Sequence, residues 1–155
     1  MIEFEAHAPG AAPVAPDLLP VEIAPPGPVC LAFSVTAEER PLEGEGQSDF
    51  AEVRWRTFIS GDMTPSRELT LGLAEFPAGG RLPPHRHAPA EFYYGQSGSG
   101  VVTVDGRDFP IGPGVALYVP PGAEHGTVAG PEGLVFLYGF ARDSFAEVEY
   151  AFSRP

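Results

Sequence analysis

The chain has 155 residues, 43% of them hydrophobic and 19% charged, which is enough for one globular domain with a buried core and too few for two ordinary domains. Its formal net charge is -12 and all nine basic residues are arginines, so the composition argues against nucleic acid or an anionic membrane as a partner. The absence of lysine also excludes Schiff-base chemistry on a lysine.

No charged and apolar leader opens the chain, and no apolar run approaches the roughly 18 to 20 residues that a membrane span needs. The single cysteine, Cys30, cannot form an internal disulfide, and we expect it to be a small buried residue. These features predict a soluble, cytoplasmic protein.

Residues 1–48 are rich in proline, alanine and glycine, as in PGAAPVAPDLLP and APPGP. Proline at this density disfavours helices and central strands. We therefore expect an extended N-terminal arm packed on the domain, with one strand at residues 29–35 (VCLAFSV). A role for the arm in dimer contacts is the alternative, and His7, which lies in it, is expected to be a solvent-exposed bystander.

Residues 49–155 form the predicted domain, in which short alternating runs are bounded by glycine and proline. Seven runs predict strands: AEVRWRTFI, ELTLGLAEF, EFYYG, GVVTVDG, GVALYVP, HGTVAG and GLVFLYGF. Seven closely spaced strands, together with 19 glycines and 19 prolines, predict an all-β barrel or double-sheet jelly roll.

Two local signals add detail to this domain. The pair Asp105-Gly106 predicts a tight hairpin turn. Residues 143–152 (DSFAEVEYAF) predict a short helix or one more edge strand, with Asp143 or Ser144 as the candidate N-cap.

Three of the four histidines, His85, His87 and His125, fall in two segments framed by glycine and proline. Residues i and i+2 of a strand share a face, so His85 and His87 point into one space, which Glu91 can reach from the next extended stretch. Three imidazoles and a carboxylate make a mixed site that suits Fe(II), Mn(II), Ni(II), Zn(II) or Cu(II). For an H-x-H pair by itself, a polar surface loop is the alternative.

The spacing around these residues is G-x5-H-x-H-x3-E-x6-G from Gly79 to Gly98, and G-x5-P-x-G-x2-H from Gly114 onward. Over roughly residues 65–140 the chain resembles the cupin superfamily, whose two conserved motifs these segments match. Ala129 stands where the second motif usually ends in asparagine, a residue that is not a metal ligand in the family. The resemblance implies a single cupin β-barrel, a double-stranded β-helix, with one divalent metal held inside by His85, His87, Glu91 and His125.

Tyr93 follows Glu91 by two residues and shares its face of the strand, while Phe92 and Tyr94 face away. A phenol beside a divalent cation has its phenolate stabilised, so Tyr93 is a candidate general base, with a space-filling role in the barrel as the alternative. The spacing H-x-H-x3-E-x-Y, with the segments WRTFISGDMTPS and FLYGFARDSFAEVEY, resembles the small cupin-type dimethylsulfoniopropionate lyases.

This finer resemblance implies a metal-dependent β-elimination that cleaves dimethylsulfoniopropionate to dimethyl sulfide and acrylate. Tyr93 would be the base, and Tyr138 and Tyr150 the next catalytic candidates. Fe(II) is the first expectation for the metal, with Mn(II), Ni(II) or Zn(II) as alternatives, and the family leads us to expect a homodimer. Aromatic faces suit a sulfonium, and the candidate substrate-binding residues are Trp55, Phe92, Tyr118, Phe136, Tyr138 and Tyr150.

Three alternatives stay open at this point. The same ligand set would serve an Fe(II) dioxygenase acting on a small organic acid. A cupin can also be a non-catalytic module that binds a zwitterionic or carboxylate small molecule. For Trp55, a place in the core of the first strand is as good an interpretation as a place in a binding pocket.

Overall fold

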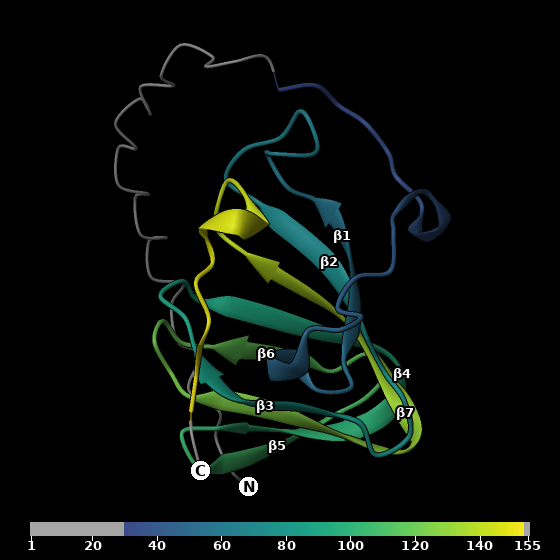
Figure 1. Cartoon of the computed structure of the whole chain (residues 1–155), viewed down its shortest axis with the longest axis vertical. Coiled ribbons are helices and arrows are strands. Elements are labelled where there is room, and N and C mark those ends of the chain that lie inside the picture. Colours follow the sequence, from purple (N-terminus) through teal and green to yellow (C-terminus); the bar gives the residue numbers. More distant parts are fainter. Residues whose placement is uncertain (1–29, 154–155) are drawn as a thin grey trace, which may run out of the picture.

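The computed structural model describes residues 30–153, and its regular secondary structure is almost entirely β-strand (Figure 1). Its strands are β1 (Arg54–Ile59), β2 (Thr70–Phe76), β3 (Arg81–Arg86), β4 (Glu91–Val104), β5 (Arg107–Ile111), β6 (Ala116–Val119), β7 (His125–Phe140) and β8 (Ala151–Phe152). Three short 3-10 turns complete it: η1 (Ala37–Glu39), η2 (Ser48–Phe50) and η3 (Phe145–Glu147). The all-β prediction is confirmed, and over residues 30–153 no helix has the length and hydrophobicity to cross a membrane.

All the strand pairs are antiparallel, and the sheet runs β1-β2-β7-β3-β8, with β4 pairing β5, β6 and β7. The long strands β4 and β7 pair along most of their lengths and tie the two ends of the barrel together. The sequence predicted two strands within β4 and two within β7, and the structure has one long strand in each place. The glycines at 95–100 create register shifts within β4 but do not end the strand. The strands β3 and β5, which contain proline, were not among the predicted seven.

Two local predictions are borne out. Asp105 and Gly106, both with positive φ (44° and 76°), form the hairpin turn between β4 and β5. The segment 143–152 contains both predicted kinds of structure in short form, the 3-10 turn η3 with Ser144 at its N-cap and the two-residue strand β8.

In the part of the predicted arm that the structure describes, residues 30–48, the expected strand is missing. Residues 30–35 form no strand, since the side chains of Leu31 and Phe33 are 60% and 40% exposed and do not face the core. Cys30 is exposed, so the prediction of a buried cysteine is wrong. Residues 1–29, which include His7 and the PGAAPVAPDLLP stretch, lie outside the described residues.

Strand register places inward side chains in rows across the barrel. One row contains Thr57 of β1, Gly72 of β2, Tyr138 of β7 and Tyr93 of β4. The next rows on either side bring Trp55, Ala74 and Phe136 together, and Thr70, Phe140 and Glu91. Because side chains alternate along a strand, the residues between these positions face outward. The interior of the barrel is therefore lined by aromatic and polar residues at its centre.

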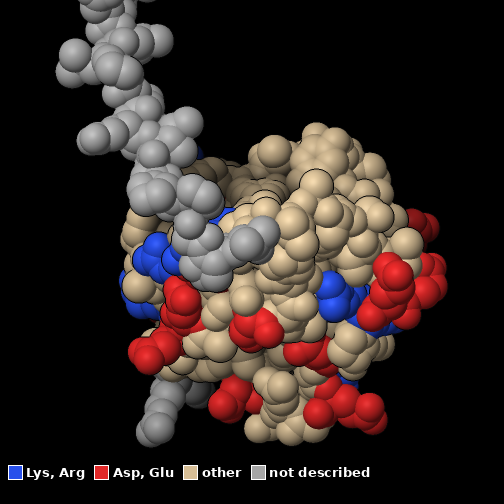
Figure 2. All heavy atoms as spheres, turned by 90° about the horizontal axis from the view of Figure 1, so that it is seen from above, with Lys and Arg blue, Asp and Glu red and all other residues tan. Residues whose placement is uncertain are grey.

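The outer surface carries the charges. Figure 2 shows acidic side chains spread across one face of the molecule, with arginine side chains lying among them. Some of the described arginines pair with acidic neighbours, as in Arg56 with Glu75 (3.0 Å between Nε and Oε1) and Arg86 with Glu124 (3.4 Å). Such exposed pairs contribute little to stability, so the fold rests on the packed interior.

Candidate metal centre and active site

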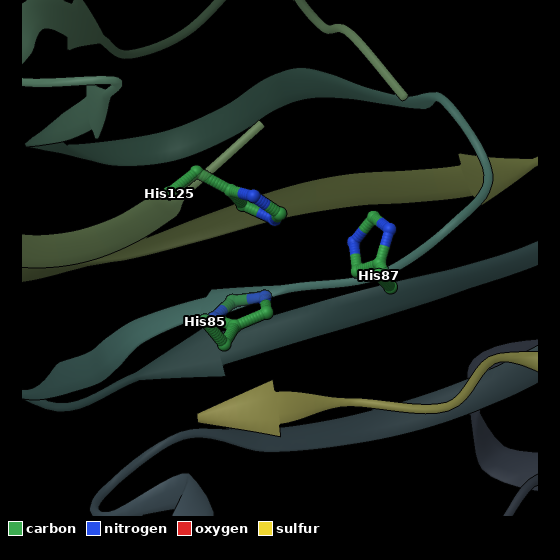
Figure 3. A group of neighbouring side chains, drawn as sticks. All are labelled: His85, His87 and His125. Carbon is green, nitrogen blue, oxygen red and sulfur yellow. The ribbon is translucent and has the colours of Figure 1, made fainter. Parts of the chain in front are cut away.

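The three predicted histidines converge inside the barrel (Figure 3). His85 lies in β3, His87 directly follows that strand, and His125 is the first residue of β7, where it pairs in register with His85. One nitrogen from each ring lies within 4.8 Å of those of the other two, and all three side chains are buried. The H-x-H pair is therefore part of an interior cluster and does not belong to a polar surface loop.

Backbone carbonyls fix the orientation of each imidazole. The Nδ1 atoms of His85, His87 and His125 lie 2.8, 3.0 and 2.9 Å from the carbonyl oxygens of Pro83, Pro89 and Ala123. A carbonyl oxygen can only accept a hydrogen bond, so each Nδ1 carries the proton. The Nε2 lone pairs are then free to bind a metal, which is the usual arrangement of a metal-ligating histidine.

Glu91 completes the cluster from the start of β4. Its Oε2 atom lies 3.1 Å from Nε2 of His87 and 3.2 Å from Nε2 of His125. Nε2 of His85 is buried and has no hydrogen-bond partner. Nitrogen lone pairs and a carboxylate repel one another at these distances unless a positive charge joins them, and burying such groups without a partner is costly. The four residues therefore fit a divalent cation.

Burial and mutual contact keep the cluster ready for a cation. Burial, and then the neighbouring His125, lower the pKa of His85 to about 4. Burial alone would raise the pKa of Glu91, but the hydrogen bonds and positive charge that His125 and His87 offer when Nε2 binds a proton outweigh it, and this pKa is lowered. At neutral pH, His85 is thus uncharged and Glu91 is ionised, as metal binding requires.

A small cavity of about 30 Å³ lies beside Glu91. A space of this size has room for about one or two water molecules. Its lining is largely aromatic and contains the three predicted tyrosines as well as Trp55 and Phe136; the full set is Phe50, Val53, Trp55, Ala74, Leu82, Glu91, Tyr93, Phe136, Tyr138, Phe145 and Tyr150.

The three tyrosines occupy different positions around this cavity. The Tyr93 hydroxyl donates a hydrogen bond of 2.9 Å to Oε2 of Glu91. The Tyr150 ring centroid lies 5.0 Å from that of His85, and the Tyr138 hydroxyl lies 3.5 Å from Oγ1 of Thr57. Burial raises the pKa of all three phenols, and for Tyr93 the charge of Glu91 adds to the effect. A phenolate at any of these positions would need a nearby cation.

The structure places two of the aromatic candidates elsewhere. Tyr118 is 64% exposed and Phe92 is 39% exposed, and the two pair in register across β6 and β4 on the outer face of the sheet. Strand alternation explains these positions, because Val119 and Glu91 occupy the inward positions next to them, and the outward direction of Phe92 was expected from the sequence. Neither Tyr118 nor Phe92 lines this cavity.

Two aromatic residues of the cavity were not anticipated. Phe50 lies in η2 and Phe145 in η3, so neither belongs to a strand whose alternation could have assigned its face. The ring centroid of Phe50 lies 4.8 Å from that of Trp55 and 5.1 Å from that of Tyr150. The aromatic density of the segment 143–152 was the only available signal for Phe145.

Comparison with known proteins fits this architecture. A family model described as a cupin domain matches residues 72–138. Dimethylsulfoniopropionate lyase DddW of Ruegeria pomeroyi is 55% identical over 120 residues, which cover 77% of this chain and 79% of that protein. This chain belongs to the cupin family that includes DddW. Both levels of the resemblance seen in the sequence are thereby confirmed.

Solved cupin structures share the fold. The polyketide cyclase RemF from Streptomyces resistomycificus superposes with a TM-score of 0.67 and 25% identity, over 81% of this chain and 87% of RemF. A chain from the crystal structures of the dimethylsulfoniopropionate lyases RdDddP and RnDddQII gives a TM-score of 0.57 at 18% identity, over 66% of this cupin and 53% of that chain. At that identity the second match supports the fold alone.

Proposed function

We propose that this cupin is a metal-dependent lyase that cleaves dimethylsulfoniopropionate to dimethyl sulfide and acrylate. The identity of 55% to DddW over most of the chain carries the proposal. The site is consistent with it, because a buried set of three imidazoles and a carboxylate lies beside a cavity lined by tyrosines.

His85, His87, Glu91 and His125 would hold the metal. Bound there, a divalent cation would act as a Lewis acid for the carboxylate of the substrate and would stabilise the negative charge that develops on it. We propose Fe(II) as the first metal to test. The same donor set also suits Mn(II), Ni(II) and Zn(II), so the ligands do not select one ion by themselves.

Tyr93 is our candidate for the general base. In the β-elimination, its phenolate oxygen would take the proton from the carbon next to the carboxylate. The electron pair of that C–H bond becomes the second bond of acrylate, and the pair of the breaking C–S bond leaves with dimethyl sulfide. Tyr93 is buried and bonded to Glu91, which keeps its oxygen at the edge of the metal cluster. Tyr138 and Tyr150 face the same cavity as candidates for a second catalytic role.

Aromatic faces make the cavity suitable for a sulfonium, which is a cation without hydrogen-bond donors. Trp55 and Phe136 contribute such faces, as do Phe50 and Phe145. The substrate is larger than the one or two water molecules that the cavity can hold, so the lining must move apart when the substrate enters. Phe145 and Tyr150 belong to the segment after β7 and can move without breaking the long strand pairs.

The direct test is to add dimethylsulfoniopropionate to the purified, metal-loaded protein and to measure dimethyl sulfide in the headspace without oxygen. We expect release with Fe(II) or Mn(II), together with an equal amount of acrylate. An Fe(II) dioxygenase would instead need and consume oxygen. The absence of dimethyl sulfide with Fe, Mn, Zn and Ni would contradict the proposal.

The expected homodimer is a further proposal of ours. Several large apolar side chains on the outer surface are more than a third exposed, including Phe92, Tyr94 and Tyr118 on neighbouring strands. A surface of this kind is often a protein contact. Light scattering on the purified protein would test it, and a monomer at micromolar concentration would contradict it.

A further inference from the structure

We infer that the carboxylate of Glu43 gives the cavity a preference for ligands with a cationic end, so that Glu43 is a specificity-determining residue of the reaction. This inference rests on the proposed lyase function. Glu43 lies before β1, in a region that the sequence assigned to the N-terminal arm, and it does not itself line the cavity.

Backbone hydrogen bonds hold Glu43 against the first strand. Its amide donates to the carbonyl of Trp55 (2.7 Å), and the amide of Trp55 donates to the carbonyl of Glu43 (3.3 Å). The next residue, Gly44, has a φ of 92°, and a Cβ atom there would overlap the Trp55 ring. The chain can therefore lie directly against the indole only with glycine at this position.

The side chain of Glu43 turns toward the interior. Oγ1 of Thr57, a residue that is only 2% exposed, donates a hydrogen bond of 3.0 Å to Oε1 of Glu43. The same Oγ1 lies 3.5 Å from the hydroxyl of Tyr138, which lines the cavity. Thr57 thus separates the carboxylate of Glu43 from Tyr138 in the cavity lining. The charge of this carboxylate acts across the gap, since after burial it is among the causes that raise the pKa of Tyr138.

No arginine neutralises this carboxylate among the ion pairs of residues 30–153. The nearby Arg56 pairs with Glu75 and donates to backbone carbonyls, and Arg40 donates to the carbonyl of Phe58. The cavity lining contains no basic residue, and the whole chain contains no lysine. The charge of Glu43 therefore remains available to a positive group inside the cavity.

The carboxylates of Glu91 and Glu43 lie at opposite ends of a series of neighbouring polar side chains. Glu91 belongs to the metal cluster and contacts Tyr93, whose neighbour across β4 and β7 is Tyr138. The hydroxyl of Tyr138 lies beside Oγ1 of Thr57, which in turn donates a hydrogen bond to Glu43. A ligand whose carboxylate is bound at the metal cluster would extend its other end toward Tyr138 and Trp55. An onium group needs no direct hydrogen bond, so a charge behind an aromatic wall can attract it.

The test compares two ligands of the same shape that lack the sulfonium leaving group, 3-(trimethylammonio)propionate and the uncharged-tail analogue 4,4-dimethylpentanoate. Their dissociation constants are measured by calorimetry on the metal-loaded protein. In Glu43→Gln, which keeps a hydrogen-bond acceptor for Thr57, we expect about tenfold weaker binding of the trimethylammonio ligand, as for one charge about 12 Å away at an effective dielectric constant of about 20. Binding of 4,4-dimethylpentanoate should stay unchanged.

Two further variants separate charge from structure. Glu45→Gln removes the same charge from an exposed position two residues away and should bind both ligands as the wild type does. Glu43→Asp keeps the charge and should keep most of the preference, even if Glu43→Gln is unstable. Equal weakening of both ligands in Glu43→Gln, or a wild type that binds the two equally or binds neither, would overturn the inference. Because calorimetry does not depend on turnover, a failure of the lyase proposal would show separately in the dimethyl sulfide assay.

Discussion

The hydroxyl of Tyr93 donates a hydrogen bond to the same Glu91 oxygen that lies 3.1 Å and 3.2 Å from the Nε2 atoms of His87 and His125. One carboxylate oxygen thus joins the proposed base to the proposed metal ligands. Burial and this carboxylate raise the pKa of Tyr93, so only a cation at the cluster could make its phenolate accessible near neutral pH.

Tyr93→Phe should remove the proposed base without removing a metal ligand. We expect the rate of dimethyl sulfide release to fall by about 10²–10⁴-fold, the usual contribution of a general base. Metal content, measured by elemental analysis, should remain at the wild-type level. Tyr94→Phe, which removes the same hydroxyl from the outer face of the same strand and keeps the ring, is the control and should keep full activity. Retained activity in Tyr93→Phe would rule out Tyr93 as the base.

Changes to the ligands should remove metal and activity together. In Glu91→Gln and His87→Ala, we expect loss of bound metal and loss of the thermal stabilisation that metal confers, which is about 4 kcal/mol when metal exceeds its Kd a thousandfold. Glu124→Gln changes a partly exposed carboxylate next to His125 and should bind metal normally. Melting temperatures with and without added metal provide the measurement. A Glu91→Gln protein with full metal content would exclude this carboxylate as a ligand.

The stability of the metal-free protein should depend on pH through His85. Its pKa in the folded protein, about 4, is below the ordinary value of 6.5, so the unfolded chain binds a proton that the folded chain does not. The stability that this histidine contributes is therefore present above pH 6.5 and is lost as the pH falls toward 4. We expect a decrease of about 3 kcal/mol over this window.

Urea denaturation of the metal-free protein at pH values from 7 to 4 would measure this decrease. The His85→Gln variant cannot take up the proton and should lose less stability over the same range. If the wild type and the variant lose equal stability, the dependence arises from other groups.

Gly72→Ala should disturb Tyr138. A Cβ atom at Gly72 would overlap the phenol of Tyr138 and lie 2.6 Å from the carbonyl oxygen of Arg56, because the ring lies across the glycine. We expect a loss of about 1–3 kcal/mol in the free energy of unfolding and a lower kcat/KM, as the phenol moves away from Thr57. Gly112→Ala meets only an ordinary contact of 3.4 Å and is the matched control. Equal stability and activity in the two variants would contradict this prediction.

Much of the site could be predicted from the sequence because its ligands lie at short, regular spacings. His85, His87, Glu91 and His125 come from two compact segments, and alternation along β4 places Tyr93 beside Glu91. The outward direction of Tyr118 could not be predicted, because the faces of the short strand β6 depend on its pairing with β4, a contact far apart in the sequence. Phe50, Phe145 and Glu43 could not be predicted, since they lie in turns and coil whose positions only tertiary packing determines.

The carbonyl oxygens that hold the three Nδ1 atoms also have a thermodynamic consequence for metal uptake. Pro83, Pro89 and Ala123 fix each ring and its tautomer before any ion arrives. Little side-chain entropy remains to be lost on binding, and His85 has no proton to release at neutral pH. Metal should therefore enter the folded apoprotein as into a preorganised chelator, and reconstitution should proceed without unfolding.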